Sequence, residues 1–154
     1  MNPAADQSAP SMDVLTTEEC YDLLRTQEIG RLGVNAEHYP LIFPVNFGMD
    51  GTTLVIRTQP GTKLAAAEHA NVTFEVDEID PRTRSGWSVL VRGLAERLTG
   101  RAGGETVLRT LGAGVAPWAP GEYGIWLRLI PHAITGRRIV PGQLPPAIDP
   151  RADL

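Results

Sequence analysis

Val55-Ile56-Arg57-Thr58-Gln59-Pro60-Gly61-Thr62-Lys63 is the stretch that says most about the fold of this 154-residue chain. The β-branched and apolar residues 52–58 predict a strand. Pro60 and Gly61 break that strand, and the alanine-rich residues 62–69 predict a short helix. We therefore expect a strand, a tight turn and the first turn of a helix to follow one another here.

The same turn carries the residue types that hold a phosphate group. Arg57 offers a planar fork of N–H donors, and Lys63 offers a second positive charge. Thr58 and Thr62 add hydroxyl groups, Gly61 lets the backbone approach closely, and free N–H groups at a helix start favour an anion. The spacing matches neither a P-loop nor a dinucleotide-binding glycine motif. A plain strand–turn–helix with a solvated arginine and lysine would read the same, so the residues alone leave both interpretations open.

Outward from the turn, the chain predicts mostly strands joined by short connections. Alternating apolar and polar residues indicate strands at 29–35, 41–49, 72–77, 87–98 and 125–130, the last extended by 133–139. Asp50-Gly51 is a hairpin signal, and Pro44 marks an edge, a bulge or a gap between paired strands. Further short helices are predicted at 17–26, behind a capping box at Thr16, and at 103–111. This pattern indicates a mainly β protein whose antiparallel sheet closes into a barrel.

Composition limits the classes of function. The formal net charge is −4 and no lysine–arginine run exists, so we expect no nucleic-acid binding. No apolar stretch is long enough to predict a membrane span. His38, His69 and His132 fall in three different elements without metal-ligand spacing, so no metal site is predicted. The single cysteine, Cys20, is interpreted as a packing residue and fits a reducing cytoplasm.

The predicted organisation is one domain between two tails. Residues 1–14 form a polar, proline-containing N-terminal tail, residues 15–140 the barrel, and residues 141–154, with four prolines, an extended C-terminal tail.

Several stretches resemble one known family in order and spacing. Leu41 to Phe47 resembles a P-V-N-[FY] strand, Arg57 to Lys63 an R-[TS]-x-x-G-x-K phosphate turn, and Gly86 to Gly93 a G-W-S-V-x-V-x-G strand. Residues 72–77 resemble the strand between them, and 127–139 resemble a closing strand. Together they resemble the FMN-binding split barrels related to pyridoxamine 5′-phosphate oxidase, in their short, general branch. The sequence lacks the full set of substrate-phosphate residues and the C-terminal basic motif of the true vitamin B6 oxidase. We therefore do not predict that activity for this chain.

The resemblance implies a six-stranded antiparallel split β-barrel with two or three short helices. It implies a homodimer with FMN at the subunit interface. Arg57 and Lys63 would bind the FMN phosphate, assisted by Thr58, Gly61 and Thr62. The isoalloxazine ring would lie against Pro44, Val45 and Asn46. Trp87 and Ser88 would lie near the phosphate or the ring, with a reach across the dimer.

The implied function is an FMN-dependent oxidoreductase acting on a small organic substrate. Two alternatives stay open at this point: a deazaflavin-dependent reductase of the same fold, and a non-catalytic module that binds flavin or haem. If flavin binds, it carries the chemistry and the protein supplies position and electrostatics. The sequence names no catalytic acid or base, and His38 is the best of three weak candidates.

Overall fold

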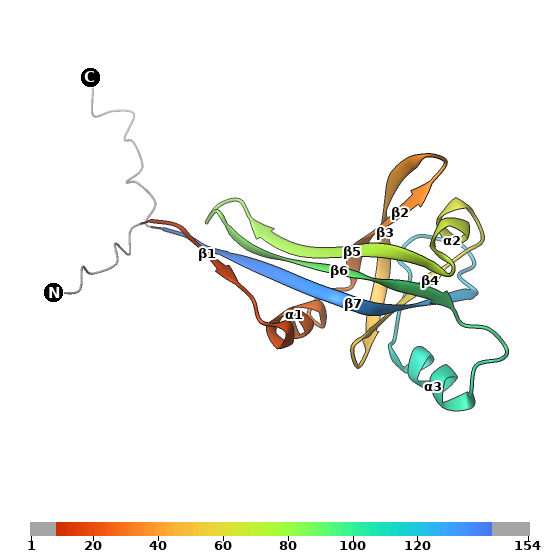
Figure 1. Ribbon diagram of the computed structural model, residues 1–154. Coiled ribbons are helices and arrows are strands. Elements are labelled where there is room, and N and C mark those ends of the chain that lie inside the picture. Colours follow the sequence, from red (N-terminus) through yellow and green to blue (C-terminus); the bar gives the residue numbers. More distant parts are fainter. Residues whose placement is uncertain (1–8, 143–154) are drawn as a thin grey trace, which may run out of the picture.

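The computed structural model describes residues 9–142, which form one long antiparallel sheet with three helices (Figure 1). The elements in chain order are β1 (Ser11–Val14), α1 (Thr17–Leu24), β2 (Ile29–Ala36), β3 (Tyr39–Asp50), β4 (Thr53–Thr58), α2 (Thr62–Ala67), β5 (Ala70–Asp80), β6 (Ser85–Arg97), α3 (Gly104–Gly112) and β7 (Ile125–Val140). The predicted C-terminal tail lies almost wholly outside the described residues.

Six of the strands close into a barrel. Their order is β7-β4-β3-β2-β5-β6, and β6 pairs with β7 along twelve residue pairs to complete the ring. The six-stranded antiparallel split barrel is thus confirmed. The seventh strand, β1, was placed in the N-terminal tail by the sequence, but it pairs with the end of β7, from Ser11 opposite Val140 to Val14 opposite Arg137.

The barrel core follows the predicted alternation. Val72, Phe74 and Val76 of β5 point inward, as do Val89 and Val91 of β6, and all five are buried. Phe74 meets Phe47 of β3 edge to face, with ring centroids 5.0 Å apart. The residues between them in sequence face outward, and of these Thr73 and Leu90 are exposed. The period of two therefore decides which side chains enter the core.

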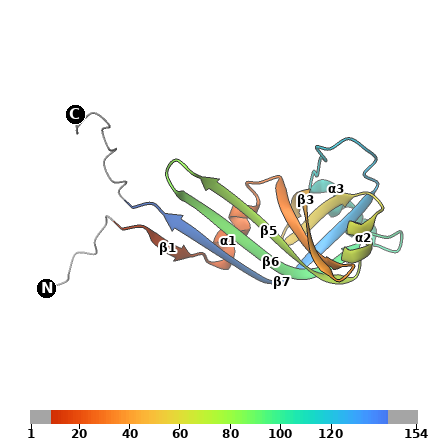
Figure 2. The same ribbon diagram turned by 90° about the horizontal axis from the view of Figure 1, so that it is seen from above.

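Beyond the barrel, β5, β6 and β7 continue as an arm, which β1 widens (Figure 2). The helix α1 covers one face of this arm. Its Cys20 is buried and packs against Gly136 of β7, where an added Cβ would lie 2.7 Å from the Sγ atom. Burial raises the pKa of the Cys20 thiol, so the thiolate is disfavoured and the interpretation as a packing residue holds.

Two turn signals are confirmed. Asp50 pairs with Thr53, and Gly51 takes a positive φ of 58° between them, as the first central residue of a tight hairpin requires. Pro44 lies opposite Arg31 of β2, while pairing of β3 with β4 begins only at Phe47. The Phe47 N–H donates to Glu28 on the β2 side. Because N–H directions alternate along a strand, the Pro44 nitrogen faces the unpaired side, where no donor is needed.

Gly93 marks a register shift between β6 and β7 that a side chain would disturb. A Cβ at this position would collide with the carbonyl group of Ile130 in the backbone of β7. We expect Gly93→Ala to lower the free energy of unfolding by about 2 kcal/mol, measured by urea denaturation, because backbone atoms cannot swing aside. Gly100→Ala is the matched control, since no atom lies within 4 Å of its added Cβ. Equal stability of the two variants would contradict the prediction.

Candidate functional site

The predicted strand–turn–helix is present. Strand β4 ends at Thr58, Gly61 precedes α2 with a φ of 154°, and α2 begins at Thr62. No side chain caps the start of α2. Gly61 and Thr62 are exposed, so their backbone and hydroxyl groups are accessible. Thr58 is buried instead, and its hydroxyl lies 3.4 Å from the carbonyl of Gln59, so it turns away from solvent.

Lys63 is the cation of this turn. Its side chain is half-buried, and its ammonium lies 5.5 Å from the centre of the Phe43 ring of β3. Desolvation by burial lowers the pKa of Lys63. Within residues 9–142, no carboxylate forms a salt bridge with it. An ammonium held partly out of water without a counter-charge favours the approach of an anion.

The guanidinium of Arg57 is occupied by backbone carbonyl groups of a loop. Its Nε and Nη2 donate to the carbonyl of Tyr123 at 3.2 and 2.9 Å, and its Nη1 donates to the carbonyl of Val115 at 3.3 Å. The guanidinium also stacks 4.7 Å from the centre of the Trp126 ring. Arg57 therefore holds both ends of the segment 115–123 against the barrel. The sequence missed this role because the loop is rich in glycine, alanine and proline and has no periodicity that predicts a partner.

The three β3 residues expected beside a flavin ring divide between the two faces of the strand. Pro44 is exposed on the outer face, whereas the Val45 side chain is buried in the barrel, so only its backbone is available to a ligand. The side chain of Asn46 connects the loop 113–124 to the barrel. Its Nδ2 donates to the carbonyl of Glu28 at 3.3 Å, and its Oδ1 accepts from the Trp118 N–H at 2.9 Å. The amide of Asn46 is thus used within the chain.

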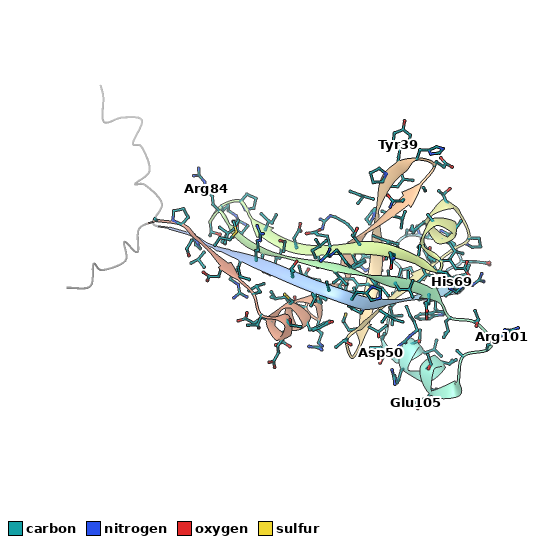
Figure 3. All side chains as sticks on the ribbon, viewed as in Figure 1. Tyr39, Asp50, His69, Arg84, Arg101 and Glu105 are labelled. Carbon is teal, nitrogen blue, oxygen red and sulfur yellow. The ribbon has the colours of Figure 1, made fainter. Side chains whose placement is uncertain are left out.

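Trp87 and Ser88 lie on the arm, at the opposite end of the sheet from the turn that carries Lys63. Figure 3 labels Arg84 at the tip of the arm, three residues before Trp87, and His69 just after α2 at the opposite end of the molecule. Trp87 is half-buried and Ser88 is exposed. A single chain therefore does not bring these two residues to the phosphate turn.

Two candidate histidines lie at exposed turns, and no metal centre is found within residues 9–142. His38 and His69 sit at turns with positive φ angles of 68° and 55°, and both are exposed. In the part of the chain that the structure describes, no cluster of three or more histidine, cysteine or carboxylate residues could hold a metal ion. Likewise, none of the described helices combines the length and the apolar character that crossing a membrane requires.

Comparisons with known proteins agree with this fold. The family model described as pyridoxamine 5′-phosphate oxidase matches residues 16–138, so the chain belongs to that family. An uncharacterized protein of Mycobacterium tuberculosis is 31% identical over 143 residues, which cover 89% of this chain and 91% of the relative.

Two solved structures illustrate the relationship. The FAD-binding protein of Mycobacterium smegmatis has a TM-score of 0.71 at 36% identity, covering 82% of this chain and 98% of that one. A conserved protein of unknown function from Corynebacterium diphtheriae has a TM-score of 0.68 at 27% identity, covering 84% and 98%.

Proposed function

We propose that this protein binds FMN and acts as an FMN-dependent oxidoreductase on a small organic substrate. The observation that carries the proposal is Lys63, a half-buried ammonium that forms no salt bridge with a carboxylate of residues 9–142, in the turn that resembles the family's phosphate site. Membership of the family and the FAD-binding relative from M. smegmatis support a flavin as the ligand. The single buried free thiol, Cys20, supports a place in the reducing cytoplasm.

The residues of the turn fit one end of such a ligand. Lys63 would bind the phosphate, with the Thr62 hydroxyl and the accessible backbone at Gly61 as further donors. Exposed Pro44 and the backbone of Val45 would form a flat surface for the ring. Asn46 and Arg57 would shape the site indirectly by fixing the loop 113–124. The flavin, when bound, supplies hydride transfer; the chain binds it, orients it and shields one face from water.

Titration with FMN, FAD and the deazaflavin coenzyme, followed by fluorescence quenching, tests the cofactor. We expect FMN to bind, and FAD is the strongest competitor because the M. smegmatis relative is an FAD-binding protein. A purified protein that is colourless and binds none of the three would overturn the proposal.

A non-catalytic flavin-binding module remains the second candidate. It is favoured by the surroundings of Lys63, whose ammonium lies over the aromatic ring of Phe43 and forms no salt bridge within residues 9–142. Stopped-flow reduction of the bound flavin by nicotinamide nucleotides separates the two functions. A flavin reduced within seconds supports the oxidoreductase, and one that stays oxidised supports the module.

We also propose that the protein is a homodimer, joined through the outer face of the arm. Exposed apolar side chains gather on this face, which we name the arm patch: Met12, Val14, Ile79, Leu90 and Ile139. Met12, Ile139 and Ile79 share one face because Met12 pairs with Ile139, Ile139 with Gly86, and Gly86 with Ile79. Val14 lies two residues after Met12 and Leu90 four residues after Gly86, so both face the same way. A second copy seated there would bury the patch and carry Trp87 and Ser88 towards its partner's flavin.

Sedimentation at micromolar concentration tests the dimer. We expect the wild-type protein to sediment as a dimer and Ile79→Asp as a monomer, because the variant would bury an unpaired carboxylate at the interface. Leu108→Asp is the control, since Leu108 is equally exposed but lies on α3, away from the patch. A stable wild-type monomer would count against the dimer.

A further inference from the structure

A groove of about 690 Å³ crosses the outer face of the barrel, at the foot of the β2–β3 hairpin. Figure 1 shows the hairpin rising away from β5, β6 and β7, and Figure 3 labels Tyr39 at its tip. Five neighbouring strands contribute to what we name the outer groove: β3 at 40–42, β2 at 33–35, β5 at 71–73, β6 at 92–93 and β7 at 132–133. Its volume falls in the range of pockets that hold small molecules.

The outer groove is separate from the Lys63 turn. Lys63 contacts Phe43, whereas the groove is lined by Ile42, the preceding residue of β3. Successive residues of a strand point to opposite faces, and Phe43 packs towards the barrel core while Ile42 is exposed outside. A ligand in the groove therefore meets a different set of side chains from a ligand at the phosphate turn.

The two walls of the groove differ in chemistry. Pro40 and Ile42 form an apolar wall, and Arg92 and His132 stand on the opposite side. Among the residues that the structure describes, no aspartate or glutamate lines the groove. Asn35, Asn71 and Thr73 add neutral hydrogen-bonding groups between the walls.

Arg92 differs from two other outward-facing arginines of the barrel, Arg31 and Arg128. Arg31 of β2 is paired with Glu75 at 3.0 Å and with Asp77 at 3.4 Å, and Arg128 of β7 is paired with Asp50 at 2.8 Å. Within residues 9–142, Arg92 forms no salt bridge with any carboxylate. Its positive charge in the groove is thus not neutralised by the described part of the chain.

We propose that the outer groove binds a small amphipathic carboxylate. The two oxygens of a carboxylate match the planar fork of Arg92, and the carboxamides of Asn35 and Asn71 can donate to the same head group. The apolar body of the ligand packs on Ile42, which otherwise stays exposed. A single guanidinium suits one negative charge better than the two of a phosphate ester. Arg92 and Leu90 lie on the same face of β6, and Leu90 belongs to the arm patch. In the proposed homodimer, the second copy would therefore border the groove and narrow its open side.

Binding of sodium octanoate, measured by amide chemical shifts and calorimetry on the full chain, tests the proposal. We expect octanoate to shift the amides of Gly33, Ile42, Asn71 and Gly93. We expect octanamide, which has the same length but no charge, to bind about tenfold more weakly. Arg92→Gln should weaken the binding of octanoate by a similar factor. Arg97→Gln is the control and should leave the affinity unchanged, because Arg97 is exposed at the end of β6 and lies outside the groove.

Three outcomes would overturn the proposal: no binding of octanoate, equal affinity for octanoate and octanamide, or shifts confined to residues outside the groove. Lys63→Ala distinguishes this site from the flavin site, because it should weaken FMN binding by about 10- to 100-fold and leave octanoate binding intact. A protein that binds octanoate in the groove but no flavin would support this inference while refuting the proposed function.

Discussion

Lys63→Ala should weaken FMN binding by about 10- to 100-fold, because a charge-assisted hydrogen bond to a phosphate contributes about 1.5–3 kcal/mol. Lys63 is the cation of the turn that carries no counter-charge in the described residues, so its charge is free to meet the ligand. Quenching of flavin fluorescence measures the affinity. Lys63→Arg is the conservative control and should retain most of it. Undiminished affinity in Lys63→Ala would contradict the assignment of the phosphate site.

Removing the charge of Lys63 should not destabilise the fold. Burial lowers the pKa of Lys63, which means that the folded state disfavours its charged form relative to the unfolded state. At neutral pH the charged ammonium therefore lowers the free energy of unfolding when no anion is bound. We expect Lys63→Met without ligand to melt at or above the wild-type temperature, so any loss of flavin reports on binding and not on unfolding.

Arg57→Ala gives the sharpest comparison with Lys63. Three of its N–H groups already donate to the carbonyls of Val115 and Tyr123. We therefore expect faster amide hydrogen exchange across the loop 113–124 and a smaller loss of flavin affinity than Lys63→Ala causes. An equal loss of affinity with unchanged exchange would show that the arginine leaves the loop to bind the phosphate directly, as the sequence motif predicted.

The hydrogen-bond partners of Arg57 could not be predicted from the sequence, whereas the barrel core could. Alternation placed Val72, Phe74, Val89 and Val91 in the core correctly, because one period of two decides both the strand and its buried face. The groups that accept hydrogen bonds from Arg57 belong to a loop 58 to 66 residues further along the chain. The glycines and prolines of this loop carry no periodic signal. The strand β1 was missed for a similar reason. Four residues are too few for a pattern, and their partner is the far end of β7.

The Trp87 motif marks a second limit. The sequence placed it correctly on a long strand, but a family motif does not say from which subunit each residue acts. In this chain Trp87 belongs to the part of β6 that forms the arm, whereas Lys63 belongs to α2, which Figure 1 shows at the opposite end of the molecule. The motif residues can meet around one ligand only if a second copy supplies some of them, which is why the flavin site and the homodimer are proposed together.

Asp50→Asn should cost about 3 kcal/mol of stability at pH 7, because it removes one partner of a largely buried ion pair. The Asp50 carboxylate accepts from Arg128 Nη2 at 2.8 Å and from Arg109 Nε at 3.3 Å, and the Asp50 and Arg128 side chains are only 13% and 12% exposed. Arg128 also donates to Thr110 at 2.7 Å, so the pair fixes α3 on the outside of the barrel. Gly51 remains in place, so the hairpin turn itself is preserved.

The pH dependence separates this ion pair from a packing effect. The hydrogen bond from Arg128 lowers the pKa of Asp50 from its ordinary value of 3.8. A carboxyl whose pKa is lowered in the folded state contributes stability that is fully present above that ordinary value and is lost as the pH falls through the lowered one. Urea denaturation of wild type and Asp50→Asn should therefore converge progressively below pH 3.8. Asp22→Asn is the control, because its pair with Arg25 is exposed and should change stability by less than about 0.5 kcal/mol. A difference between wild type and Asp50→Asn that stays constant from pH 7 down to pH 2.5 would mean that shape, and not charge, holds α3 in place.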